Sequence, residues 1–218
     1  IVDRLKREFK VECNQGEPQV AYKEALTKSV THRERLKKQT GGSGLFADME
    51  FELGPCDQEF LESDEFKSGK DKLQFDWQIV GGAIDKNYVK PIKVGFKAMM
   101  ENGILANYAI ESMKVRVYDG SMHSVDSKPV AFELCAKEGF KAAAKSCTPK
   151  IMEPIMKLEV ITPEENMGDV MGDLNRRRGQ LQGVDAKGEA QIIKAKVPLS
   201  EMFGYVTQLR TITSGRAT

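Results

Sequence analysis

Several features common in other protein classes are missing from this sequence. No apolar run approaches the roughly 18–20 residues of a membrane-spanning helix, and the first ten residues, IVDRLKREFK, are too charged for a signal peptide. We therefore expect no membrane partner. Cysteine is scarce, with 4 residues at unrelated spacings and no C-x-x-C pair, and there are only 2 histidines, His32 and His123. A structural zinc or other metal site is accordingly not predicted.

An excess of charge of either sign is also missing. The chain has 33 Lys and Arg residues against 32 Asp and Glu, a formal net charge of +1. Bulk electrostatics therefore do not predict DNA binding, and any contact with RNA must come from local patches. The hydrophobic content of 40% is enough for a core. Cys135 and Cys147 fall on a helical pattern, so we expect buried thiols in a cytoplasmic protein.

A nucleotide-binding loop of the Walker A type is absent. Lys70 follows Gly69, but Asp71 stands where that motif requires Ser or Thr, and no upstream glycine has the right spacing. We expect no nucleotide-hydrolysis site, no cofactor and no catalytic residue in this chain. The carboxylate pair Glu164–Glu165 is typical of the start of a helix rather than of a general acid and base.

What is present first is a domain of mixed strand and helix patterns. A helix is predicted at 1–10 and a short strand at 11–14, and residues 19–53 predict a long β-hairpin with a glycine tip at Gly41, Gly42 and Gly44. The further predictions are a surface loop at 54–72, strands at 75–80 and 112–118, a turn at Asp119-Gly120-Ser121, and helices at 88–102 and 129–145. The residues expected in their core include Met113, Val115, Val117, Val130, Leu134, Phe140 and Ala144.

The last third of the chain predicts a second domain. Strands are expected at 155–162, 179–185 and 190–197, and helices at 163–178 and 199–210. This β-α-β-β-α sequence is the ferredoxin-like order without its final strand. We interpret the chain as a cut piece of a longer protein, in which strand 155–162 is left with an open edge. Helix 163–178 carries Arg176, Arg177 and Arg178 in its last turn, where cations suit the helix dipole, and Gly179 is predicted to end it.

The same region carries a specific family resemblance. TPEENMGDVMGDLNRRRGQLQG and LSEMFGYVTQLRTITSGRAT resemble the C-terminal domain of translation elongation factor G, the bacterial translocase. IVDRLKREFKVECNQGEPQVAYKEA resembles the junction that precedes domain IV of that family. KKQTGGSGLFA, IVGGAIDKNYVKPIKVGFKAMMENG and VYDGSMHSVDS resemble segments of domain IV itself. The resemblance covers nearly the whole chain, and its motifs are in order.

The resemblance implies a domain division, a fold class and a function. Residues 1–17 would be the end of domain III, 18–150 domain IV and 151–218 most of domain V. The fold would be α+β, with domain IV sharing the fold of a domain of ribosomal protein S5 and domain V being ferredoxin-like. The function implied is the ribosome-binding part of a GTPase that moves transfer RNA and messenger RNA. GTP and magnesium would bind a domain outside this chain, so this part is not expected to be an enzyme.

The resemblance also assigns candidate site residues. Two loops at the end of domain IV would enter the decoding A site of the ribosome, and His123 takes the position of a histidine that reaches toward the transfer RNA–messenger RNA duplex. Histidine can donate to phosphate or a 2′-hydroxyl and can stack on bases. The tip residues are Gln39, Thr40, Gly41, Gly42, Ser43, Gly44, Asp119, Gly120, Ser121, Met122 and His123. Arg176, Arg177 and Arg178 are candidate contacts to ribosomal RNA of the large subunit.

Several positions depart from the family pattern. Ser43 stands where Arg is common, Leu45 where Gln is, Asp85 where Pro is and Met122 where Tyr is. The missing Arg removes a phosphate contact, for which the nearby cations are expected to compensate. Those cations are Arg33, Arg35, Lys37 and Lys38.

Other interpretations of these residues stay open. The glycine tip can be a flexible turn, His123 a solvated side chain and the three arginines ordinary surface charge. A ribosomal protection protein or a GTPase-independent paralogue fits the same motifs. An enzyme on an S5-like fold, such as a small-molecule kinase, would need a glycine-rich loop that opens a helix, whereas GGSG leads into a strand pattern.

Overall fold

The computed structural model describes residues 7–8, 19–40 and 43–218. Arg7 and Glu8 are helical, and the rest of the predicted helix 1–10, the predicted strand 11–14 and the tip glycines Gly41 and Gly42 lie outside the described residues. The chain divides into two compact units, one at Tyr22–Met152 and the other containing Glu153–Thr218. Each is described by itself.

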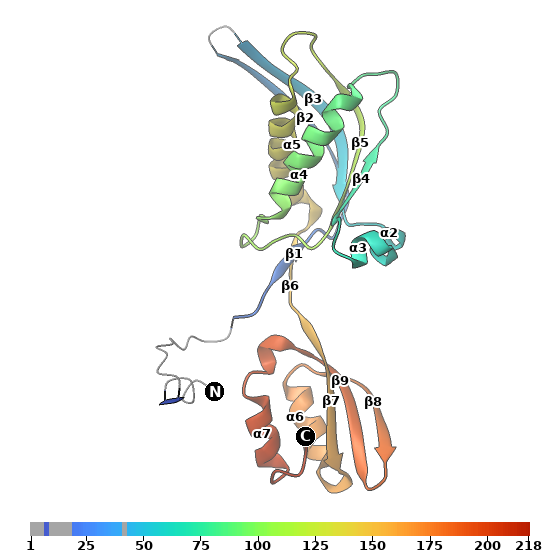
Figure 1. Ribbon diagram of the computed structural model, residues 1–218, viewed down its shortest axis with the longest axis vertical. Coiled ribbons are helices and arrows are strands. Elements are labelled where there is room, and N and C mark those ends of the chain that lie inside the picture. Colours follow the sequence, from blue (N-terminus) through green and yellow to red (C-terminus); the bar gives the residue numbers. More distant parts are fainter. Residues whose placement is uncertain (1–6, 9–18, 41–42) are drawn as a thin grey trace. The chain divides into compact units, whose positions relative to one another are not determined.

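The first unit is built on a mixed β-sheet (Figure 1). Its strand order is β2-β3-β5-β4, with β4 parallel to β5 and the other neighbours antiparallel. On β3 and β5 alternate residues are fully buried, Phe51 and Val115 among them, because successive side chains of a strand point to opposite faces. The strands are β2 Val30–Thr40, β3 Ser43–Gly54, β4 Leu73–Trp77 and β5 Met113–Ser121, with a separate pair of β1 Lys23–Ala25 and β6 Lys150–Met152.

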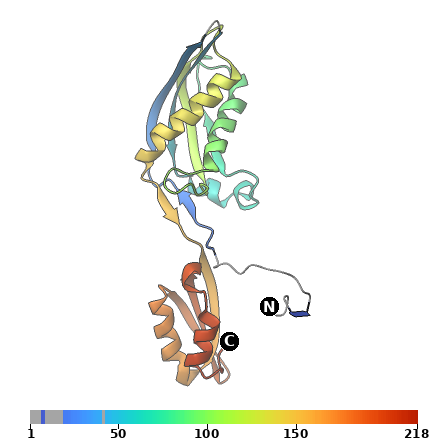
Figure 2. The same ribbon diagram turned by 90° about the vertical axis from the view of Figure 1, so that its left-hand side faces the viewer.

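Two helices cover the buried face of this sheet (Figures 1 and 2). They are α4, Val89–Met100, and α5, Pro129–Ala144, and they lie side by side. Gly95 permits their close approach, because a Cβ there would lie 2.6 Å from the carbonyl oxygen of Glu133. The aromatic side chains that fill the space between helices and sheet are fully buried. They are Phe51, Phe96, Phe132 and Phe140.

Three sequence predictions for this unit are wrong. The predicted loop at 54–72 contains two short helices, α2 Gln58–Glu62 and α3 Asp64–Lys67, and the Ser63 hydroxyl caps α3 by accepting from the amide of Phe66 at 3.3 Å. The predicted strand 75–80 lies two residues earlier, at β4, and Val80 is 84% exposed. Val130, predicted to be core, is exposed on the outer side of the first turn of α5.

The predicted turn at Asp119-Gly120-Ser121 is also wrong. These residues continue β5 and pair with Glu50, Met49 and Asp48 of β3, after a bulge that accommodates Tyr118. A bulge inserts one residue into a strand without ending it, so the polar D-G-S pattern does not mark a chain reversal here. Gly120 is required by close packing, since a Cβ there would lie 2.3 Å from the carbonyl oxygen of Asp48.

A buried carboxylate organises the loop after α4. Glu24 of β1 is only 1% exposed. Its side chain accepts hydrogen bonds from four backbone amides, at 2.7 Å from Ile104, 2.8 Å from Ala106, and longer distances from Leu105 and Tyr108. Backbone donors thus replace the water that the carboxylate loses on burial. The sequence did not predict that Glu24 would be buried and would bind this loop, because it is a single acid in a loosely alternating segment.

The second unit has the predicted β-α-β-β-α element order. Its sheet has the strand order β7-β9-β8, and both helices cover one face of it (Figures 1 and 2). The helices are each preceded by a 3₁₀ turn, η3 at Glu164–Asn166 and η4 at Leu199–Glu201, so they start later than predicted. The bounds are β7 Ile155–Pro163, α6 Met167–Arg176, β8 Gln180–Lys187, β9 Ala190–Pro198 and α7 Tyr205–Ile212.

The outer edge of β7 carries one backbone partner among the described residues. Thr218 and Ile161 exchange both of their backbone hydrogen bonds, at 2.8 and 3.0 Å. Such an exchange is the pattern of a hydrogen-bonded antiparallel pair. No described strand pairs with this edge from Ile155 to Val160.

Candidate nucleic-acid interface

Two segments far apart in sequence form a single surface at one end of the first unit. The loop at 122–127 after β5 lies against β3 where β3 leaves the hairpin tip (Figure 1). The amide of Phe46 donates to the carbonyl oxygen of Asp126 at 3.0 Å. The Ser127 hydroxyl donates to the carbonyl oxygen of Phe46 at 2.9 Å and accepts from the amide of His123 at 2.8 Å. We call the hairpin end and this loop the tip.

Gly44 makes this contact possible. It is buried, and a Cβ at this position would lie 2.6 Å from the carboxyl carbon of Asp126. The glycine therefore has a packing role in the tip, beyond the conformational freedom that the sequence pattern suggested.

The tip encloses a hollow of about 270 Å³ that two lysines border. Lys37 and Lys38 are exposed, and neither forms an ion pair with any described residue. Unpaired ammonium groups beside a hollow are suited to phosphate, which they attract as point charges. The lining residues are Lys37, Lys38, Gln39, Gly44, Leu45, Phe46, His123 and Asp126.

The loop itself orients the His123 ring. Its Nδ1 accepts hydrogen bonds from the backbone amides of Val125 and Asp126, at 3.3 and 3.2 Å, and the Asp126 carboxylate lies farther away at 3.7 Å. Because these amides occupy Nδ1 as an acceptor, Nε2–H is the ring donor that remains for a ligand. The side chain is 53% exposed, which leaves Nε2–H available to donate to a ligand.

The two arginines expected to assist at the tip are already bound. Arg33 donates to both carboxylate oxygens of Asp48, at 3.0 and 2.8 Å, and Arg35 lies 3.4 Å from the same group. The hydrogen bond from Arg33 lowers the pKa of Asp48 to about 2, against the opposing effect of its burial. Asp48 in turn raises the pKa of Arg33. The cations left to replace the missing Arg at Ser43 are therefore Lys37 and Lys38.

The predicted tip residues do not all lie at the hollow. Asp119 and Ser121 face the Arg33–Asp48 pair instead, with Ser121 Oγ donating to Asp48 at 2.7 Å. Thr40 and Ser43 are opposite each other in the hairpin register, and Met122 begins the loop with a half-exposed side chain. Sequence reasoning missed Ser127 and Asp126, because their partners lie about 80 residues away along the chain.

The three arginines at the C-terminal end of α6 and just after it are in different environments. Arg177 is held by Asp173 at 2.9 Å and lies over the Tyr205 ring at 5.0 Å, so it is part of the fold. Arg178 binds both oxygens of Glu153, at 2.8 and 3.0 Å, and its φ of 57° makes it the left-handed residue that ends the helix, a role predicted for Gly179. Only Arg176 is exposed and without a partner in the described part of the chain.

The described residues offer little for other chemistry. No group of three or more His, Cys, Asp or Glu side chains in the described ranges is placed to hold a metal ion. Among the helices that the structure describes, none has the length and apolar character needed to cross a bilayer.

Comparison with known proteins places the chain in a family. Residues 18–148 match the family model for domain IV of elongation factor G, and residues 150–218 match the model for the elongation factor G C-terminus. The chain belongs to the elongation factor G family. It is 58% identical over 218 residues to elongation factor G of Cytophaga hutchinsonii and 59% identical over 217 residues to that of Amoebophilus asiaticus. It spans 30% and 29% of those relatives, and all of this chain is covered.

A solved structure agrees with this family assignment. A protein of Thermus thermophilus known from a crystal structure superposes with a TM-score of 0.81 at 34% sequence identity. The match covers 99% of this chain and 30% of that protein. The chain thus has the mixed α and β fold of domain IV and the C-terminus of elongation factor G.

Proposed function

We propose that this chain is the ribosome-binding C-terminal part of a translational GTPase that promotes the movement of transfer RNA and messenger RNA during elongation in the cytoplasm. Residues 18–150 act as domain IV, with an S5-like fold, and residues 151–218 as a ferredoxin-like domain V. Residues 1–17 belong to the end of domain III. GTP and magnesium bind outside this chain, which contributes no catalytic group.

The observation that carries this proposal is the composition of the tip. Lys37 and Lys38 have no acidic partner in the described structure, and His123 presents Nε2–H beside them. The ammonium groups and the imidazole N–H can bind backbone phosphates and 2′-hydroxyls, which are the same for every base. The tip is therefore suited to recognise the shape of RNA at the decoding A site and not its sequence. The partners are ribosomal RNA of both subunits and the transfer RNA–messenger RNA duplex of the A site.

The mechanism that follows is steric and electrostatic. A tip that occupies the A site after transfer RNA has left it prevents the transfer RNA from slipping back. Such a tip shifts the equilibrium between the ribosome before and after translocation only if it binds the post-translocation state more tightly. The Ser127 hydroxyl links the two segments of the tip through its hydrogen bonds to Phe46 and His123. These bonds keep the tip in one shape, as a steric block requires.

A paralogue of the same family is the second candidate. Ser43 and Leu45 at the tip and Asp85 on the neighbouring loop depart from the family pattern. Asp85 caps the 3₁₀ turn η1, Lys86–Tyr88, by accepting from the amide of Asn87 at 2.8 Å, so here it has a local structural use.

The test measures binding of this chain to ribosomes over a series of salt concentrations. The double variant K37Q/K38Q is expected to bind more weakly and to lower the slope of log K against log salt by about 1 per lysine removed. The matched control is K67Q/K70Q, which removes two exposed lysines that the described structure leaves unpaired at α3 and just after it. Equal losses for both variants, or no binding by the unmodified chain, would overturn the proposal.

A further inference from the structure

Two lysines of the second unit face each other across neighbouring strands. Lys157 of β7 and Lys196 of β9 are direct partners in the antiparallel register. Both are exposed and lie on the sheet face that α6 and α7 leave uncovered. Like charges placed directly opposite each other in a sheet destabilise it. The pair is therefore more stable when an anion lies beside it.

Two acidic groups near this pair, Asp185 and Glu153, are already bound to other cations. Asp185 lies 2.7 Å from Lys194 and raises the pKa of that lysine, and the charge of Glu159 acts on Lys194 in the same direction. Glu153 is held through both oxygens by Arg178. No described acid lies within ion-pair distance of Lys157 or Lys196, which leaves two positive charges uncompensated.

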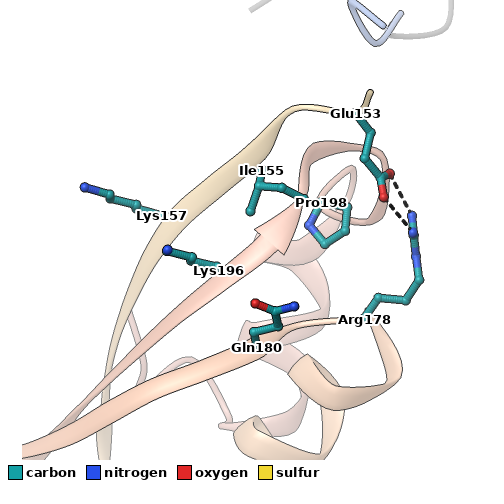
Figure 3. A pocket seen from close by; sticks show the side chains of 7 residues that line it. All are labelled: Glu153, Ile155, Lys157, Arg178, Gln180, Lys196 and Pro198. Atoms are coloured by element: carbon teal, nitrogen blue, oxygen red, sulfur yellow. Dashed lines mark hydrogen bonds and ion pairs between the residues drawn. The ribbon is translucent and has the colours of Figure 1, made fainter. Parts of the chain in front are cut away.

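The pair borders a hollow of about 600 Å³. Figure 3 shows the two lysine side chains pointing the same way, and the Glu153–Arg178 pair on the opposite side of the hollow. Ile155 and Pro198 lie between them, and Gln180, the β8 partner of Lys196, adds an amide. The surface thus has two cations on neighbouring strands, β7 and β9, and a neutral amide on β8, beside a small apolar patch.

We propose that this uncovered sheet face, with Lys157 and Lys196 at its centre, binds the phosphodiester backbone of RNA. The proposal rests on the ribosome-binding function above and names a second contact surface for it. Paired ammonium groups without acids attract closely spaced phosphates, and binding relieves their mutual repulsion. No residue of β7, β8 or β9 is aromatic, so the face has no platform for base stacking. The contact therefore reads backbone and not sequence.

The proposal assigns the RNA contact of the second unit to Lys157 and Lys196 instead of Arg177 and Arg178. Arg177 and Arg178 are committed to carboxylates and to the Tyr205 ring, so freeing them would break internal contacts. Lys157 and Lys196 lose nothing on binding an anion. An acidic protein segment would satisfy the same charges, and the experiment separates it from RNA.

The experiment compares the unmodified chain with the double variant K157Q/K196Q. Binding is measured to intact ribosomes and to protein-free ribosomal RNA over a salt series, with K67Q/K70Q as the charge-matched control. We expect the double variant to bind both targets more weakly and to lower the slope of log K against log salt by about 2. Its thermal midpoint should stay the same or rise, since a like-charge pair is removed, which shows that the variant is folded.

The outcomes distinguish this inference from the proposed function. Unchanged slopes for K157Q/K196Q together with a loss for K37Q/K38Q would overturn the sheet-face inference and leave the tip proposal standing. A loss for K157Q/K196Q with none for K37Q/K38Q would do the reverse. Weaker binding to ribosomes but not to protein-free RNA would mean that a ribosomal protein occupies the face, which also overturns the inference.

Discussion

Replacing Asp48 by Asn tests the charge network that withholds two arginines from the tip. The Asp48 side chain has no exposed surface and binds Arg33 through both oxygens. Its pKa falls from 3.8 to about 2. At about 1.4 kcal/mol per unit, the ionised carboxylate contributes about 2 kcal/mol to the free energy of unfolding. Asp48→Asn should therefore lower the stability of the first unit by about that amount near neutral pH.

The loss of stability expected for Asp48→Asn depends on pH. A carboxylate with a lowered pKa stabilises the fold fully above its unfolded pKa, and that contribution disappears as pH falls through 3.8 toward 2. The difference in stability between the two proteins should thus be constant from about pH 7 to pH 5 and shrink by about pH 3. Urea unfolding followed by fluorescence reports on this unit alone, because the only tryptophan of the chain is Trp77 of β4.

An exposed ion pair of the same unit provides the control. Glu138 and Lys141 of α5 are 3.1 Å apart with more than half of each side chain exposed, so Glu138→Gln should change the unfolding free energy by less than about 0.5 kcal/mol. If Asp48→Asn costs no more than the control, or costs the same at low and neutral pH, the reasoning is refuted. The same variant releases Arg35, so its ribosome binding should show a salt slope steeper by up to about 1.

Two further substitutions test how loops are held in the first unit. Glu24→Gln replaces the acceptor of four backbone amides by a group with one oxygen, and should cost about 3 kcal/mol because buried donors lose a charged partner; unchanged hydrogen exchange at Ile104 would contradict the role given to Glu24. Gly44→Ala places a Cβ against the Asp126 carboxyl and should displace the loop at 122–127. The Phe46 amide would then exchange faster at little cost in global stability, and equal protection in both proteins would show that Gly44 has no such role.

Much of the fold was predictable because its signals are local. Alternation of Met113, Val115 and Val117 placed a strand correctly, and the helix at 88–102 followed from apolar spacing. The predictions failed for different reasons: α2 and α3 are short helices with local contacts such as the Ser63 cap, whereas the turn was overridden by long-range strand pairing. Asp119-Gly120-Ser121 has the composition of a turn, yet pairing with β3 across a bulge keeps it in a strand.

The site was predictable only in part. His123 and Gly44 were singled out by their motifs and both line the hollow, but their contact with RNA stays a prediction. Cys135 and Cys147 were correctly predicted to be buried. No local pattern could show that Arg33 is bound by Asp48 or that Ser127 bridges to Phe46, because these partners meet only through the register of β2, β3 and β5. The position of Lys157 opposite Lys196 likewise depends on the register of β7 and β9.

The central claim is that the tip lies against RNA of the decoding region. It is tested most directly by hydroxyl-radical cleavage from a probe on Met122→Cys, in a background with Cys13 and Cys56 replaced by Ser. Cys135 and Cys147 can remain, because burial raises the pKa of these thiols to about 12 and about 11 and keeps them unreactive.

A second probe on Val206→Cys supplies the comparison, since Val206 is exposed on α7 of the other unit. The account predicts that the Met122→Cys probe cuts small-subunit ribosomal RNA at the decoding site and that the Val206→Cys probe does not. Cleavage elsewhere only, or the same cleavage pattern from both probes, would contradict it.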